Sequence, residues 1–177
     1  MPSRLASRTL TPVTATHPLF AAIGNTPLIE LTRIGELPHG VRLFAKAEFM
    51  NPGGSIKDRA AAAMVLDGIE RGLLRLPAAD EPPQQLPTII DATSGNTGIA
   101  LAMIGAALGI GTTLVMPENT SPERKATMRN LGATVIDTVP AEDGSDGAFE
   151  AVREIVAHDP TAYFYPNQYD NPANARA

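Results

Sequence analysis

The chain contains no cysteine among its 177 residues. It therefore cannot form a disulfide framework, supply a thiolate nucleophile or bind zinc through sulfur, and cysteine usage says nothing about its redox compartment. Histidine is also scarce, since only His17, His39 and His158 are present. These three lack the close spacing of a metal-binding motif such as HExxH, so we expect no metal site.

Long apolar runs are absent as well. The longest, Ile99 to Leu108, is interrupted by Gly105 and is shorter than the roughly 18 residues that a membrane helix needs. We therefore expect no membrane partner and, by default, a cytoplasmic location. Residues 1–20 are basic and acid-free, as in organellar targeting peptides, but their prolines interrupt any amphipathic helix, which favours a short leader.

The chain also lacks a clustered basic face. Its net charge is -5, and residues 76–177 carry five Lys and Arg against thirteen Asp and Glu. Arg124, Lys125 and Arg129 form a tight basic cluster, but they lie among helix-patterned residues, where we expect a solvated helix face. A protein that neutralises phosphates needs a larger basic surface, so we expect no nucleic-acid partner.

From residue 88 onward, short β-rich runs alternate with helix-patterned stretches. This order is typical of an α/β fold in which crossover helices join parallel strands. Ser121 and Pro122 give one of these helices a well-defined start. The predicted strands are 88–91, 112–116, 134–138 and 162–165, and the predicted helices are 96–108, 122–131 and 146–158.

Upstream, residues 27–31 and 41–47 have strand patterns, and a helix is predicted from about Ile56 to Leu74. Small and apolar residues occupy one face of this helix, which indicates that it packs on a sheet. Residues 76–87 contain four prolines, and we expect a surface loop there. The charged residues of the predicted helix fall largely on the other face: Asp58, Arg59, Asp67, Glu70 and Arg71.

Two strand-to-helix junctions, residues 51–59 and 91–98, are rich in glycine and hydrogen-bonding residues. Ligands bind beyond the carboxyl ends of strands in an open α/β sheet, where such junctions meet. The second junction suits a carboxylate or a phosphate, although a plain turn has the same composition. Lys57, near the positive end of a helix, is a candidate for Schiff-base chemistry, with an exposed or phosphate-contacting lysine as the alternative. Neither junction fits a nucleotide-binding motif.

Several motifs, in the same order, resemble those of cysteine synthases and cystathionine β-synthases. The resemblance extends from about residue 20 to the end of the chain. Residues 92–103 are most similar to the B-type cysteine synthase. The motifs are Ile23–Leu28 (IGNTPL), Lys46–Glu48 (KAE), Asn51–Arg59 (NPGGSIKDR), Thr93–Gly98 (TSGNTG), Met116–Glu118 with Ser121, Glu123 and Arg124, Leu131–Ala133 (LGA) and Asn167–Pro172 (NQYDNP).

The resemblance implies a tryptophan-synthase β-like fold (fold type II), with parallel sheets and crossover helices, and pyridoxal 5′-phosphate (PLP) as the cofactor. It implies that Lys57 forms the Schiff base with PLP and acts as the catalytic base, and that Asn96 binds the ring hydroxyl oxygen of the cofactor. The residues implied to hold the substrate α-carboxylate are Thr93, Ser94, Gly95, Thr97 and Gln168.

The implied reaction is a β-replacement in which sulfide displaces the acetoxy group of O-acetyl-L-serine and gives L-cysteine. Two alternatives within the family are cystathionine β-synthase chemistry, with homocysteine as the nucleophile, and the use of O-phosphoserine. An alternative of another class is a non-catalytic, truncated chain that keeps the fold. The family also implies a homodimer at full length.

The resemblance covers only the N-terminal half of the family, whose downstream half carries the loop that binds the cofactor phosphate. It implies that residues 1–46 are a leader and the start of a large cofactor domain, and that residues 47–160 are a small mobile domain. Residues 161–177 would begin the return to the large domain, which is incomplete. We expect the chain alone to be inactive or weakly active because it lacks the phosphate loop.

Overall fold

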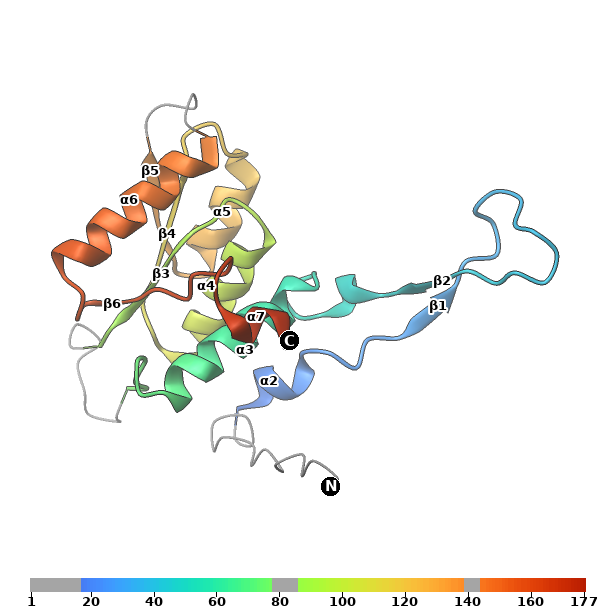
Figure 1. Ribbon diagram of the computed structural model, residues 1–177, viewed down its shortest axis with the longest axis horizontal. Helices are drawn as coiled ribbons and strands as arrows, with labels where there is room; N and C mark the ends of the chain where they lie inside the picture. Colours follow the sequence, from blue (N-terminus) through green and yellow to red (C-terminus); the bar gives the residue numbers. More distant parts are fainter. Residues whose placement is uncertain (1–16, 78–85, 139–143) are drawn as a thin grey trace, which may run out of the picture.

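The computed structural model describes residues 17–77, 86–138 and 144–177 (Figure 1). Its main body is a four-stranded parallel sheet in the order β5-β4-β3-β6. The predicted α/β fold with a parallel sheet is therefore confirmed, and each predicted strand is present to within two residues at either end. The strands are β3 (Thr88–Ala92), β4 (Thr112–Pro117), β5 (Thr134–Thr138) and β6 (Tyr163–Phe164).

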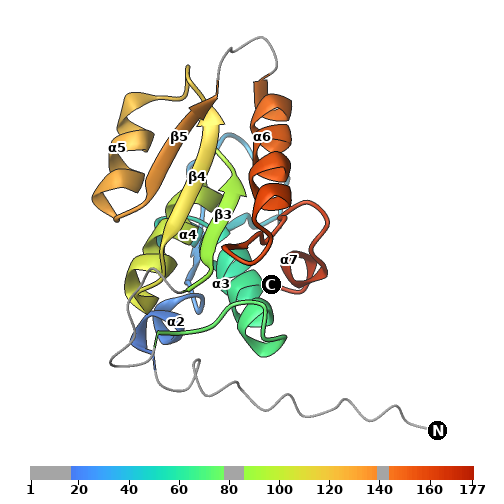
Figure 2. The same ribbon diagram turned by 90° about the vertical axis from the view of Figure 1, so that its left-hand side faces the viewer.

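Helices cover both faces of this sheet. Helices α3 (Lys57–Glu70), α4 (Asn96–Leu108) and α5 (Pro122–Asn130) lie on one face, and α6 (Gly144–His158) lies on the other (Figure 2). Alternate strand residues face opposite layers: Ile89 packs with α3 and α4, whereas Ile90 packs with α6. Burial on both faces explains why β3 and β4 are so rich in apolar residues.

Residues 28–46 form an arm that extends away from the main body (Figure 1). In the arm β1 (Leu28–Glu30) pairs antiparallel with β2 (Phe44–Lys46). These strands are shorter than predicted, but Leu31 N still donates to Leu43 O at 2.8 Å, and Ala47 N donates to Pro27 O at 2.9 Å. The pairing thus covers most of both predicted segments.

Three short helices join these parts. Helix α2 (Pro18–Ala22) packs on the α3 and α4 layer, and the 3₁₀ turn η1 (Glu48–Met50) leads from the arm into α3. Helix α7 (Pro172–Ala175) starts at Asn171, whose side chain accepts a hydrogen bond from Ala173 N at 2.9 Å. Arg176, directly after α7, pairs with Asp67 of α3 at 3.2 Å, so the last segment returns to α3.

The structure corrects two expectations about charged residues. Asp58, predicted on the exposed face of its helix, is fully buried; Gly53 N donates to its Oδ2 at 2.5 Å, and its Oδ1 has no partner among the described residues. Lys125, predicted to lie on a solvated face, is 7% exposed, and its ammonium group lies 2.8 Å from Asp137 Oδ1 on the neighbouring β5. For Lys125, a partner on the neighbouring strand offsets the cost of burying the charge, whereas the partner of Asp58 lies in the turn directly before its own helix.

Four further expectations concern the proline-rich loop, the leader, membrane helices and metal sites. The greater part of the predicted proline-rich loop and of the predicted leader falls in the ranges 78–85 and 1–16, which the structure does not describe. None of the helices in the described part of the chain is long and apolar enough to cross a membrane. The described ranges also contain no group of three His, Asp or Glu side chains placed to hold a metal ion.

Candidate active site

A cavity of about 410 Å³ opens at the carboxyl edge of the parallel sheet. Its walls come from the start of α3, the loop between β3 and α4, the start of α5, one side of α6 and the segment after β6. This is the edge at which open α/β sheets bind ligands. The cavity brings together every site residue predicted from the sequence: Lys57, Thr93, Ser94, Gly95, Asn96, Thr97 and Gln168.

The loop after β3 leads directly into the N-terminus of α4. Gly95 is the N-cap residue, and Asn96 is the first residue of the helix. The first N–H groups of a helix have no acceptor within the helix, and the helix dipole is positive at this end. The loop is therefore suited to hold a carboxylate, as the sequence predicted.

Gln168 reaches this loop from the segment after β6. The Thr97 hydroxyl donates to Gln168 Oε1 at 2.9 Å. This bond leaves the side-chain NH₂ group of Gln168 as a donor toward the cavity. Two segments 71 residues apart meet here because β3 and β6 are neighbours in the sheet.

Gly98, in the first turn of α4, is closely packed. A Cβ atom at this position would lie 2.9 Å from Met128 Cε of α5 and 3.1 Å from Thr93 Cγ2. A side chain at this position would displace one of these two groups. The glycine therefore lets α5 approach the end of α4 that faces the cavity.

Lys57 is the first residue of α3 and lies at the end of a tight turn. Gly54 has φ of +82°, which glycine adopts without strain. The Ser55 hydroxyl accepts a hydrogen bond from Lys57 N at 3.1 Å, and Asp58 Oδ2 accepts one from Gly53 N at 2.5 Å. These bonds fix the backbone on both sides of the lysine, whose side chain is exposed toward the cavity.

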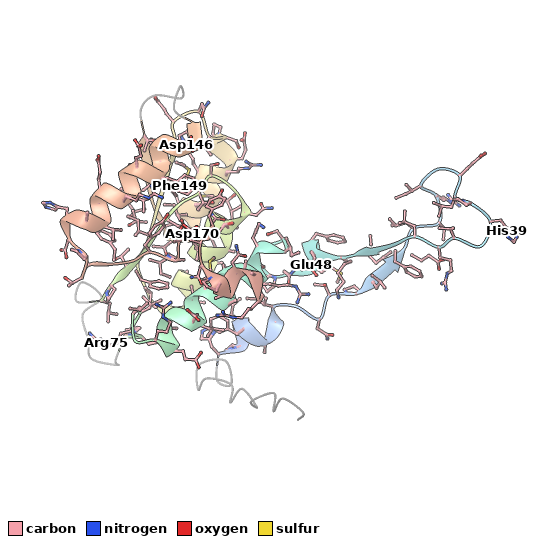
Figure 3. The ribbon with its side chains drawn as sticks, viewed as in Figure 1. His39, Glu48, Arg75, Asp146, Phe149 and Asp170 are labelled. Atoms are coloured by element: carbon pink, nitrogen blue, oxygen red, sulfur yellow. The ribbon has the colours of Figure 1, made fainter. Side chains whose placement is uncertain are left out.

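A polar network anchors this turn to the base of the arm, where Glu48 lies (Figure 3). Glu48 accepts two hydrogen bonds from the Arg59 guanidinium, at 2.8 and 2.9 Å, and one from the Thr26 hydroxyl at 2.6 Å. Asn51 donates to Glu48 Oε2 at 2.9 Å and accepts from Gly24 N at 2.8 Å. The bonds from Arg59 and Thr26 lower the pKa of Glu48 to about 2.

We predict that Glu48→Gln lowers the thermal unfolding midpoint at pH 7, because the amide cannot accept both guanidinium bonds. A carboxyl group with a lowered pKa stabilises the fold above its unfolded pKa and loses this effect as the pH falls. The gap between variant and wild type should therefore close between about pH 4.5 and pH 2. Thermal unfolding followed by circular dichroism measures it.

Glu30→Gln is the matched control for this prediction. Glu30 also accepts two hydrogen bonds from an arginine, Arg42, but the pair lies on the exposed arm. Exposed ion pairs contribute little to stability, so this variant should unfold close to wild type. An equal effect of the two substitutions would show that the network at Glu48 has no special role.

Asp91 is the first residue of the junction 91–98, but the sequence predicted neither its burial nor a role for its side chain; it lies near the end of β3, directly before the cavity loop. The residue is fully buried, and its Oδ1 accepts a hydrogen bond from Ala92 N at 2.8 Å. Its Oδ2 has no partner among the described residues. Burial raises the pKa of Asp91 to about 7, because the charged form loses its hydration.

Three further cavity residues were not assigned a role from the sequence. Arg124 and Tyr169 lie within motifs that carry the family resemblance, but no sequence signal marks Phe149. Phe149 and Tyr169 pack edge to face, with ring centroids 5.1 Å apart. This aromatic pair forms the side of the cavity next to α6.

The chain is similar to pyridoxal-phosphate dependent enzymes over most of its length. The family model described as "Pyridoxal-phosphate dependent enzyme" matches residues 19–177. The cysteine synthase of Aquifex aeolicus is 46% identical over 165 residues, which make up 92% of this chain and 47% of that protein. Cysteine synthase A of Escherichia coli is 43% identical over 152 residues, or 86% of this chain and 43% of that protein. The chain thus spans about half the length of the curated relatives it matches.

Solved structures of two similar enzymes have the same fold as this chain. The crystal structure of an O-ureido-L-serine synthase gives a TM-score of 0.79 at 37% identity and covers 91% of this chain and 46% of its own. An O-acetylserine-dependent cystathionine β-synthase from Helicobacter pylori gives 0.73 at 36% identity, covering 88% of this chain and 47% of its own. The family model matches most of the length of the chain, and a lysine and a helix N-terminus line one cavity. The chain belongs to the pyridoxal-phosphate dependent enzymes, and its curated relatives are of the cysteine synthase type.

Proposed function

We propose that the chain provides the lysine-bearing part of a cysteine synthase active site, which converts O-acetyl-L-serine and sulfide to L-cysteine and acetate. One observation carries the proposal: the Lys57 side chain and the loop at Thr93–Thr97 line the same cavity. The reaction needs an amine that removes the α-proton and a site that holds the α-carboxylate beside it.

The cavity residues fit one end of PLP. The cofactor aldehyde needs an amine, which Lys57 supplies, and its ring hydroxyl oxygen needs a donor, which the Asn96 side chain supplies. No acidic residue is among those that line the cavity, so nothing there repels an anionic cofactor. When bound, PLP supplies the electron sink that stabilises negative charge at the substrate α-carbon.

The chain's own residues then have two tasks. Thr93, Ser94, Gly95, Thr97 and Gln168 hold the substrate α-carboxylate at the positive end of α4, which fixes the α-carbon relative to Lys57. The Lys57 amine accepts the α-proton, and the bond from the β-carbon to the acetate oxygen breaks. Sulfide then adds to the β-carbon, and Lys57 returns a proton to the α-carbon.

Further properties of the whole protein belong to the same proposal. Residues 47–160 act as a small mobile domain that closes over the substrate and excludes water, while residues 1–46 and 161–177 belong to the large domain. The whole protein is a cytoplasmic homodimer. The projecting arm supports the separation of β1 and β2 from the small domain, because it leaves the main body near Glu48 (Figure 3), whereas β6 pairs with β3 in the sheet of the main body.

A second candidate is cystathionine formation from an activated serine and homocysteine. It is favoured by the likeness to the Helicobacter pylori enzyme, described as an O-acetylserine-dependent cystathionine β-synthase, at 36% identity. Cysteine synthesis is preferred because the two curated relatives described above, at 46% and 43% identity, are both named cysteine synthases.

Product analysis separates these candidates. The chain, and any longer protein that contains it, is incubated with PLP and either O-acetyl-L-serine or O-phospho-L-serine, together with either sulfide or homocysteine. We expect the highest kcat/KM for O-acetyl-L-serine with sulfide, and cysteine as the product. Cystathionine as the main product would favour the second candidate, and a longer protein that folds and gives no product would favour a non-catalytic role.

A further inference from the structure

The three basic residues of α5 point in two different directions. Lys125 and Arg129 face β5, where both pair with Asp137, at 2.8 and 3.9 Å. Arg124 instead lines the cavity. The basic cluster seen in the sequence is therefore not one surface, and only part of it is used to bind β5.

The position of Arg124 follows from the packing of α5 on α4. Met128, four residues later on the same face of the helix, is fully buried against the first turn of α4. The Met128 methyl group would be 2.9 Å from a Cβ atom at Gly98, which lies in the predicted anion-binding junction. Arg124 is thus held one helical turn from this contact, beside the loop that receives the substrate carboxylate.

The charged side chains that line the cavity around Arg124 are all positive. The cavity is lined by two cationic side chains, Lys57 and Arg124, and by no acidic side chain. The Arg124 guanidinium makes no hydrogen bond or ion pair within the ranges that the structure describes. An arginine that is free, lines a cavity and has no acidic neighbour there is available for an anionic ligand, which it can hold through two parallel N–H donors.

We propose that Arg124 binds the leaving group of the amino-acid substrate. This group departs as an oxyanion and is separate from the α-carboxylate. This inference rests on the proposed β-replacement. In that reaction the bond between the β-carbon and the leaving oxygen breaks, and the electron pair stays on that oxygen, while the α-proton goes to Lys57. Acetate and phosphate both depart as oxyanions, and Arg124 stabilises the charge that develops on either.

Ligand binding to the chain tests this without turnover. Binding of O-phospho-L-serine and of L-serine is followed by NMR titration of the isotope-labelled chain. We expect O-phospho-L-serine to bind about tenfold more tightly, the effect of one charge-assisted contact, and Arg124→Gln to remove this preference. Arg129→Gln, on the same helix but facing Asp137, should retain it.

Gln168→Ala separates failure of this inference from failure of the proposed function. It should weaken binding of both ligands equally, because both carry the α-carboxylate. If Gln168→Ala changes neither, the carboxylate site is wrong, whereas a preference that survives Arg124→Gln overturns the role of Arg124. The Arg124 Nε–H resonance of the wild-type chain is a second measurement that needs no variant, and it should shift with O-phospho-L-serine and not with L-serine.

Turnover of the active protein identifies which leaving group is natural. If acetate departs at Arg124, Arg124→Gln should lower kcat with O-acetyl-L-serine more than it changes KM, because the charge appears only as the bond breaks. If the substrate is a phosphate ester, the variant should instead raise KM for O-phospho-L-serine. A variant with wild-type kinetics for both esters would contradict the inference.

Discussion

Replacing Lys57 with alanine is expected to reduce cysteine formation from O-acetyl-L-serine and sulfide by about a thousandfold or more in any active form of the protein. The substitution removes the amine that attaches the cofactor and the base that takes the α-proton. Lys57 is an exposed residue at the start of α3, so the fold should tolerate the change. Steady-state assay of cysteine measures the loss.

Two controls show whether the loss is due to the missing amine. Far-ultraviolet circular dichroism of Lys57→Ala should match wild type, which excludes unfolding as the cause. Arg71→Ala is a suitable control, because Arg71 directly follows α3 and its exposed side chain pairs with Asp67. Activity of Lys57→Ala within tenfold of wild type would show that another group performs the chemistry.

Asp91→Asn is expected to change the pH dependence of stability by about 4 kcal/mol. Burial raises the pKa of Asp91 from 3.8 to about 7 in the folded chain. The folded state therefore holds this proton more tightly than the unfolded state, so the stabilising effect is complete below about pH 4 and is lost as the pH rises to about 7. Asparagine has nearly the same shape and cannot titrate, so this loss should be absent in the variant.

Urea unfolding from pH 4 to pH 8 tests the prediction. The unfolding free energy of wild type should fall relative to Asp91→Asn as the pH rises, whatever the difference between them at the lowest pH. Asp146→Asn is the control, because Asp146 is exposed in the first turn of α6 and should give the wild-type slope. Parallel curves for wild type and Asp91→Asn would mean that Asp91 is ionised throughout.

Much of the fold could be predicted from the sequence because local patterns and tertiary packing agree. Helix α4 occupies the predicted residues 96–108, and the predicted cap at Ser121 is present, with Arg124 N donating to the Ser121 hydroxyl at 3.4 Å. The alternation of strands and helices identified the parallel sheet. Its strand order, with β6 beside β3, was not predicted, since it depends on contacts between distant segments.

The environments of single charged residues could not be predicted, for the same physical reason. Asp58 and Lys125 have the sequence pattern of exposed residues, but both are buried, Asp58 behind the turn at Gly53 and Lys125 against Asp137 of β5. The burial of Asp91 gave no signal, because nothing in its neighbours reveals how the sheet encloses it. The cavity residues Lys57 and Gln168 were identified through the family motifs, and the meeting of Gln168 with Thr97 required the structure.

The most direct test of the central claim is reductive trapping of the cofactor. The protein is incubated with PLP, reduced with borohydride, digested and mapped by mass spectrometry, in the chain and in any longer protein that contains it. Lys46 and Lys125, the other two lysines of the sequence, serve as internal controls. We predict that the reduced cofactor is found on Lys57 and that Lys57→Ala carries none. If both the chain and the longer protein fold but neither is labelled on Lys57, or if the label is on Lys46 or Lys125 instead, the account is contradicted.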